Sequence, residues 1–301
     1  MKPKLIICAG IGWAATRSIM FSLPTCNHGI CKEDHLLDEL SNKHAYESVL
    51  AAELKAVKTA RQLKDAVNRR KKYDYPKDIW DNVTLSKYIT LYKNNAKGYD
   101  GVTDFTNANQ KLPMNFLVEI KQRLEEHFDI KVIMIFRNPV RRLFSECCAW
   151  YNNKWVETEQ PTAKDYFMEV LDTGSLTKSE NYTYHFDNWK IAGYNPHPII
   201  MEDLYTPKEV IYRYGHPANA PESNTLQELK DYLEVPVDLY PTAYWPEKGV
   251  DAPRIEGLNC QKSDTETLSK EEYEYARKKL THHYIECKAH GIYPKYAIDS
   301  W

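Results

Sequence analysis

The sequence predicts an α/β fold in which helices cover both faces of a central parallel β-sheet. Two segments, residues 4–23 and 131–145, share one order of elements, namely a short apolar strand, a loop and a helix. Between them, a predicted helix at residues 114–127 leads into the strand at 131–136, which completes a βαβ-like unit. Such units place their strands parallel, with right-handed crossovers. The predicted helix turns four apolar side chains inward: Phe116, Leu117, Ile120 and Leu124.

The segment at residues 131–145 indicates an anion-binding site. Its apolar run ends at Arg137 and is followed by Pro139, which fixes φ and suits the first turn of a helix. Arg137 is therefore expected at the carboxyl end of a strand, with Ser145 a few turns along. Backbone N–H groups at a helix start and a planar guanidinium both favour a phosphate. On charge alone, a surface helix with solvated arginines is the alternative.

The N-terminal segment has the character of a phosphate-binding loop. A short strand at residues 4–8 runs into small residues and then into a helix. Small side chains let the backbone approach an anion closely, and hydroxyl and guanidinium groups add donors. The match to the nucleotide-triphosphate P-loop lacks the second glycine and the lysine. The candidate anion-binding residues here are Trp13, Ala14, Ala15, Thr16, Arg17 and Ser18.

Together the two segments resemble the sulfotransferases that use 3′-phosphoadenosine 5′-phosphosulfate (PAPS) as donor. The family's second signature is an arginine at a strand end, a proline, a second arginine and a serine, matched by Arg137, Pro139, Arg142 and Ser145. The resemblance implies a P-loop-like three-layer α/β/α fold with helical insertions. It assigns Arg137 and Ser145 to the donor's 3′-phosphate and residues 13–18 to its 5′-phosphosulfate. It extends over residues 4–37, 98–151 and, more faintly, 182–204.

A further motif is similar to a segment of heparan-type and other carbohydrate sulfotransferases. Lys32, Glu33 and His35 match its Lys-Glu-x-His pattern, in which the glutamate is the general base. The resemblance implies that Glu33 activates an acceptor hydroxyl or amine, with Lys32 and His35 beside it. A carboxylate serves as base at neutral pH when burial raises its pKa, whereas a helix-capping carboxylate is the alternative role. Thr106 lies in a segment that resembles the strand lining the family's acceptor side.

The chain departs from the family pattern at the loop lysine, because alignment on Gly10 places Trp13 there. Arg17, at the start of the helix, is the nearest cation in sequence, and its guanidinium can neutralise a leaving phosphate. An outward-pointing helix arginine is the alternative. Arg254 and Lys262 correspond by position to a basic family loop that closes over the 3′-phosphate.

Length and composition fit one α/β domain spanning residues 1–301, with a helical insertion at about 42–97. A net charge of -2 argues against a general nucleic-acid-binding protein. No apolar run approaches the roughly 20 residues that span a bilayer. Because the first strand begins at residue 4, no signal sequence is expected, and a cytoplasmic protein of bacterial, viral or truncated form is predicted. The last helix is predicted from a capping box, Ser269 with Glu272, and from a buried stripe, Tyr273, Ala276, Leu280 and Tyr284.

The sequence therefore predicts a PAPS-dependent sulfotransferase that acts on a small-molecule or glycan acceptor and releases adenosine 3′,5′-bisphosphate (PAP). No metal is expected, since the 7 cysteines lack zinc-ligand spacing and free thiols are the predicted state. Two alternatives stay open. A P-loop kinase or NTPase would need a lysine in the loop and a magnesium-binding aspartate, and an inactive nucleotide-binding relic would need neither. No oligomeric state is predicted.

Overall fold

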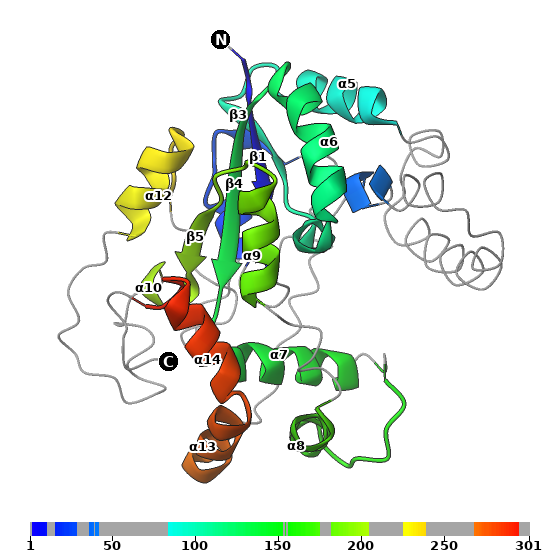
Figure 1. Cartoon of the computed structure of the whole chain (residues 1–301), viewed down its shortest axis with the longest axis vertical. Helices are drawn as coiled ribbons and strands as arrows, with labels where there is room; N and C mark the ends of the chain where they lie inside the picture. The colour runs from blue at the N-terminus through cyan, green and yellow to red at the C-terminus, as the bar shows by residue number, and fades with distance from the viewer. Residues whose placement is uncertain are drawn as a thin grey trace, which may run out of the picture. The chain divides into compact units, whose positions relative to one another are not determined.

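A parallel β-sheet forms the centre of the protein. The computed structural model describes residues 2–10, 16–28, 36–38, 40–41, 84–152, 154, 156–174, 182–204, 225–238 and 268–294. Its strands are β1 (Lys4–Cys8), β2 (Cys26–Asn27), β3 (Gly101–Asp104), β4 (Asp129–Phe136) and β5 (His197–Ile200), in the order β2-β3-β1-β4-β5 (Figure 1). The pairs β1 with β3, β2 with β3 and β4 with β5 are parallel. This arrangement confirms the predicted α/β class.

The strands are buried because helices cover the sheet. Residues 5–8 of β1 and 132–136 of β4 are all buried, as expected for parallel strands that read as continuous apolar runs. β3 begins at Gly101, which pairs with Lys4. A Cβ at Gly101 would lie 3.1 Å from Lys4 Cβ and 3.2 Å from its carbonyl oxygen. The close approach of β3 to β1 therefore favours glycine at this position.

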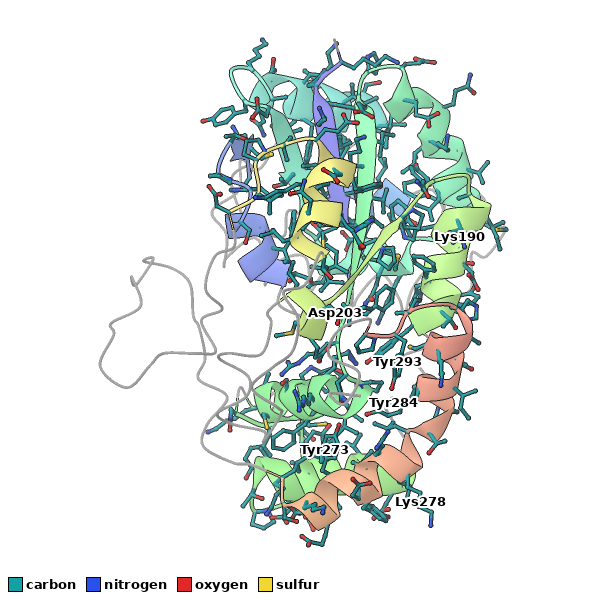
Figure 2. The ribbon with its side chains drawn as sticks, turned by 90° about the vertical axis from the view of Figure 1, so that its left-hand side faces the viewer. Lys190, Asp203, Tyr273, Lys278, Tyr284 and Tyr293 are labelled. Carbon is teal, nitrogen blue, oxygen red and sulfur yellow. The ribbon has the colours of Figure 1, made fainter. Side chains whose placement is uncertain are left out.

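Helices join and flank the strands. They are α1 (Thr16–Phe21), α5 (Leu85–Asn95), the 3-10 helix η1 (Asn107–Lys111), α6 (Met114–Glu125), α7 (Pro139–Asn152), α8 (Ala163–Thr173), α9 (Tyr182–Ile191), α10 (Met201–Leu204), α12 (Thr225–Leu233), α13 (Lys270–Lys279) and α14 (Thr281–Ala289). In α6, the four side chains predicted to face inward are buried, which confirms that prediction. Figure 2 labels side chains of the last two helices, among them Tyr273 on α13 and Tyr284 on α14.

The chain divides into two compact units. The first contains residues 1–9, 25–132 and 188–196, and the second contains residues 10–24, 133–187 and 197–301. The predicted single domain with an insertion at about 42–97 stays a prediction, because residues 42–83 lie outside the described residues.

In the first unit, the packing of α5 begins with a helix cap. The Thr84 side chain accepts a hydrogen bond from the Lys87 backbone N–H, which satisfies one free donor of the first turn. The helix buries Tyr88 and Tyr92, whose rings stack with centroids 4.3 Å apart. Polar capping and apolar burial thus act together to define where α5 begins and which face it turns inward.

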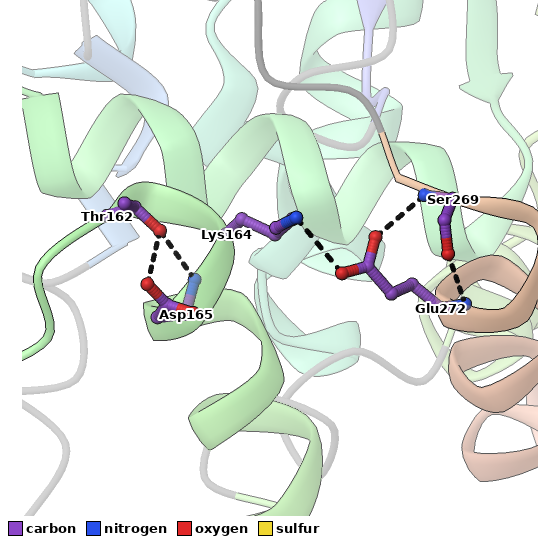
Figure 3. A network of polar contacts seen from close by, with 5 residues as sticks. All are labelled: Thr162, Lys164, Asp165, Ser269 and Glu272. Carbon is purple, nitrogen blue, oxygen red and sulfur yellow. Dashed lines mark hydrogen bonds and ion pairs between the residues drawn. The ribbon is translucent and has the colours of Figure 1, made fainter.

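In the second unit, α7, α8 and α13 share one hydrophobic core. Its buried members are Val140, Leu143 and Cys147 of α7, Tyr166, Phe167, Val170 and Leu171 of α8, with Ala276 and Leu280 at α13. A polar contact near the helix starts also joins α8 to α13 (Figure 3). Ser269 and Glu272 form the predicted capping box, and Lys164 Nζ of α8 lies 3.0 Å from Glu272 Oε1.

The predicted C-terminal helix is two helices, not one. Of its predicted buried stripe, Ala276 and Leu280 are buried, whereas Tyr273 and Tyr284 are half-buried. The backbone at Leu280 has φ -96° and ψ 12°, outside the helical region, and α14 begins at the next residue. No glycine or proline marks this break, so the local sequence gave no sign of it. The break places Tyr273 and Tyr284 on separate helices.

Candidate anion-binding site

The structure brings together the arginine and the serine that the sequence singles out. Arg137 directly follows the end of β4, and Ser145 lies on α7 about two turns from its start. Arg137 Nη1 donates a hydrogen bond to Ser145 Oγ at 2.9 Å. Ser145 is buried and Arg137 half-buried. A guanidinium and a hydroxyl that meet in this way can both donate to one phosphate group.

Asn138 caps the helix that carries Ser145. Its carbonyl oxygen accepts from the Arg142 N–H at 2.9 Å, and its side-chain Oδ1 accepts from the Arg141 N–H at 3.1 Å. Asparagine is among the preferred N-cap residues because its side chain satisfies such donors. Asn138 is 0% exposed, so its remaining polar groups need partners within the protein.

Those partners are Glu202, Tyr273 and Tyr284, which lie on three other elements. These three residues and Asn138 are called the Asn138 cluster. The Asn138 N–H donates to Glu202 Oε1 at 2.9 Å, which ties the turn to α10. Asn138 Nδ2 donates to the Tyr273 hydroxyl at 2.9 Å. The Tyr284 hydroxyl donates to Asn138 Oδ1 at 3.2 Å. Residues on α10, α13 and α14 thus hold the turn between Arg137 and α7.

The Tyr284 hydroxyl is kept protonated. Burial, followed by the charge of Tyr273 and its hydrogen bond, raises the pKa of Tyr284 far above its ordinary range, although a backbone hydrogen bond from Val140 acts in the opposite direction. A neutral hydroxyl is the form that can donate to Asn138 Oδ1. The cluster therefore keeps its pattern of donors and acceptors near neutral pH.

The start of α7 already has acceptors within the protein. The Val140 backbone hydrogen-bonds to Tyr284, and the Arg141 N–H has Asn138 Oδ1 as its acceptor. The sequence predicts that backbone N–H groups at this helix start help to bind the anion, but these two are engaged elsewhere. Side chains, namely Arg137 and Ser145, are therefore the groups of this segment best suited to bind it.

Arg142, the second arginine of the predicted signature, is buried within the second unit. It is 2% exposed, and its Nη2 lies 2.6 Å from Glu146 Oε2. Its guanidinium carbon is 5.6 Å from the centre of the Tyr182 ring, a cation–π geometry. The charge of Arg142 is thus compensated inside the protein, which gives it a structural role between α7 and α9.

Most other predicted site residues cannot be placed. Thr16 is buried at the start of α1, and Arg17 and Ser18 follow it in that helix, with side chains that are not described. The others lie outside the described residues: Trp13, Ala14, Ala15, Lys32, Glu33, His35, Arg254 and Lys262. Their assigned roles stay predictions.

Thr106, the predicted acceptor-side residue, lies within a closed polar cluster of the first unit. It is 0% exposed, and its N–H donates to Asp104 Oδ1 at 3.1 Å. Asp104 also accepts from Asn109 Nδ2 at 2.9 Å and from the Tyr88 hydroxyl at 3.0 Å. Burial raises the pKa of the Asp104 carboxyl, although these hydrogen bonds act in the opposite direction. Contact of Thr106 with an acceptor stays a prediction.

Asp104 and His28 are polar residues at strand ends that are not among the predicted site residues. Asp104 could have been found, because an aspartate that caps the backbone two residues on is a recurrent turn signal. His28 follows β2, and its Nδ1 lies 3.0 Å from Thr103 Oγ1. Burial lowers the pKa of its imidazole. A histidine at a strand end offers no comparable local pattern.

Cysteine and membrane features add little to the site. Cys8, Cys26, Cys147, Cys148 and Cys287 are buried free thiols, as predicted for these five. Within the described part of the chain, no group of three or more His, Cys, Asp or Glu residues is arranged to hold a metal ion. None of the helices described there has the length and apolar character that a bilayer crossing requires.

Comparison with known proteins gives similarity in structure only. No protein-family model matches the chain, and no curated protein matches its sequence. A sulfotransferase from Alicyclobacillus acidocaldarius is 12% identical with a TM-score of 0.48, covering 99% of this chain and 98% of its own. The sulfotransferase domain of the Synechococcus PCC 7002 olefin synthase is 14% identical with a TM-score of 0.39, covering 93% and 94%.

Proposed function

We propose that this protein is a PAPS-dependent sulfotransferase in which Arg137 and Ser145 hold the donor's 3′-phosphate. The observation that carries the proposal is their side-chain hydrogen bond of 2.9 Å at the junction of β4 and α7. A guanidinium and a hydroxyl that already lie within hydrogen-bond distance of each other can converge on one phosphate group. The Arg137–Ser145 pair is therefore suited to an incoming anion.

The proposed reaction is an in-line displacement at sulfur. An acceptor oxygen or nitrogen forms a bond to sulfur as the bond from sulfur to the 5′-phosphate oxygen breaks, and PAP leaves. Glu33 takes the acceptor proton, and Arg17 neutralises the charge that develops on the leaving phosphate. Residues 13–18 bind the 5′-phosphosulfate, Arg254 or Lys262 closes over the 3′-phosphate, and Lys32, His35 and Thr106 contact the acceptor. A glycan acceptor is the narrower proposal, which rests on the motif at residues 32–35.

The residue after β4 favours this proposal over a P-loop kinase or NTPase. Such enzymes need a magnesium-binding aspartate at a strand end. Here β4 is followed by Arg137, and the aspartate that ends β3, Asp104, already accepts hydrogen bonds from Tyr88, Thr106 and Asn109 within the protein. An inactive relic of the same fold would keep donor binding and lose turnover.

The proposal is tested first by ligand binding and then by turnover. PAP is expected to bind without Mg²⁺, and at a hundredfold its dissociation constant to stabilise the fold by about 2.7 kcal/mol. Thermal unfolding with PAP and with Mg-ATP measures this. Stabilisation by Mg-ATP but not by PAP would contradict the proposal. Labelled PAPS with a panel of sugars, lipids, phenols and tyrosyl peptides then separates enzyme from relic.

The proposed base has its own test. Glu33→Gln keeps the shape of the side chain and removes its basicity, so PAP affinity should be unchanged while transfer falls by about 10² to 10⁴. Wild-type turnover in this variant would assign Glu33 a structural role. Arg17→Ala should lower transfer far more than PAP affinity, because its charge acts mainly in the transition state.

A further inference from the structure

Asn138 connects the two residues of the proposed donor site. Asn138 is covalently bonded to Arg137 and caps the helix that carries Ser145. Any rotation of the Asn138 peptide or slip of the first turn of α7 would move Arg137 relative to Ser145. Their 2.9 Å contact therefore depends on how firmly Asn138 is held.

The side chain of Asn138 is held from outside α7 by two hydroxyls on different helices. Tyr273 of α13 accepts from Nδ2 at 2.9 Å, and Tyr284 of α14 donates to Oδ1 at 3.2 Å. The Arg141 N–H can only donate, so it requires the amide oxygen on its side. The two hydroxyls, which can donate or accept, hold the amide in that orientation from outside α7.

These helices are placed independently of the two hydroxyls. α13 shares the core of α7 and α8 through Ala276, and its capping glutamate Glu272 pairs with Lys164 of α8. The Tyr284 ring of α14 packs against the same core, and phenylalanine keeps that ring. Loss of the hydroxyls should therefore leave α13 and α14 in place. It would remove a constraint on Asn138 without removing the support of the fold.

We propose that Tyr273 and Tyr284 are positioning residues of the donor site, which through Asn138 hold Arg137 and Ser145 in the geometry that recognises the 3′-phosphate. This inference rests on the proposed function. Neither tyrosine needs to touch the donor for the effect. Loss of the two hydroxyls should therefore weaken the preference for a nucleotide that has the 3′-phosphate over one that lacks it.

The test compares PAP with adenosine 5′-monophosphate, which lacks the 3′-phosphate. Dissociation constants are measured by calorimetry on the full chain, well below the unfolding temperature of every variant. In Tyr273→Phe/Tyr284→Phe, the preference for PAP should fall by about threefold to tenfold, the equivalent of one neutral hydrogen bond. The affinity for adenosine 5′-monophosphate should stay near that of wild type, which a general loss of stability would not produce.

Tyr275→Phe is the matched control. Tyr275 lies on the same helix, and its hydroxyl donates to Asp172 of α8, away from Asn138. This variant loses one hydroxyl and one hydrogen bond from α13, and it should keep the wild-type preference. An equal loss of preference in Tyr275→Phe would overturn the inference, because the effect would then come from α13 in general.

Arg137→Ala distinguishes the inference from the proposed function. If Arg137→Ala abolishes the preference for PAP and Tyr273→Phe/Tyr284→Phe keeps it, the donor site stands and the positioning role is wrong. If wild type shows no preference, or Arg137→Ala retains it, both proposals are wrong. If circular dichroism shows that the double variant does not fold, the affinities for PAP and adenosine 5′-monophosphate are compared in the two single variants instead.

Discussion

Two polar clusters follow the ends of two strands, and they are built for different purposes. In the first unit, Asp104 at the end of β3 accepts from Thr106, Asn109 and Tyr88, and it is 2% exposed. In the second unit, Asn138 after β4 is equally buried, but its neighbour Arg137 is half-buried and bonded to a neutral hydroxyl. The Asp104 cluster stabilises the turn after β3. The Asn138 cluster stabilises the turn after β4, and because it adjoins Arg137 it can also present that cation to a ligand.

Substitution of Asp104 should have the largest effect, and that effect should be on the free energy of unfolding. Asp104→Ala leaves three buried donors without their acceptor, and each such donor costs about 1 to 3 kcal/mol. The free energy of unfolding, measured with urea, should therefore fall by roughly 3 to 5 kcal/mol. Asp104→Asn keeps one acceptor oxygen and the shape of the side chain, so it should lose far less. Equal unfolding midpoints for Asp104→Ala and wild type would show that the cluster does not support the turn.

At Arg137 the effect should appear in binding and not in folding. Arg137→Ala removes a charge-assisted contact to phosphate, which is worth about 1.5 to 3 kcal/mol, or roughly 10- to 100-fold in PAP affinity. The free energy of unfolding should change by about 1 kcal/mol, because the hydrogen bond to the neutral Ser145 hydroxyl is lost. Calorimetry and urea unfolding measure the two quantities separately.

Arg123 provides the matched control for Arg137. Its Nη2 donates to Ser86 Oγ at 3.3 Å, the same chemical pair, but on the exposed face of α6 and α5. Arg123→Ala removes the same charge from the protein and should leave PAP affinity unchanged. If both variants weakened PAP binding equally, the change in net charge would explain the loss, and the proposed contact of Arg137 with the 3′-phosphate would be wrong.

The smallest expected effect concerns acid sensitivity beside the Asp104 cluster. Burial lowers the pKa of His28 from its ordinary 6.5, so below that pH the unfolded chain binds a proton that the folded chain does not. Stability should therefore decrease as the pH falls through this window. His28→Asn removes the titrating group, and its unfolding free energy should fall less than that of wild type between about pH 7.5 and about pH 5.5. Parallel curves would contradict the effect of burial on this imidazole.

The sequence predicts local and periodic features well. The buried strands, the inward face of α6 and the capping box at Ser269 all follow from spacing within one element, and the structure confirms them. The contact between Arg137 and Ser145 spans only 8 positions, and the strand end and helix start bring them together. Patterns of this length are visible in a sequence.

The Asn138 cluster could not be predicted in the same way. Its members Glu202, Tyr273 and Tyr284 lie 64, 135 and 146 positions further along the chain. Tyr273 and Tyr284 fit an apolar stripe, so periodicity explains why their rings are partly buried but gives no sign of what their hydroxyls contact. Which polar group each hydroxyl meets depends on tertiary packing, and the break at Leu280 that separates the two helices has no signal in the local sequence.

The long separation within the Asn138 cluster has a consequence for synthesis on the ribosome. The nascent chain contains Arg137 and Ser145 before half of it is made, yet the two hydroxyls that hold Asn138 arrive only with residues 273 and 284 of 301. Until then, Asn138 has no side-chain partner from α13 or α14. Selectivity for the donor's 3′-phosphate, as proposed, therefore becomes complete only late in translation, once residues 273 and 284 have been made.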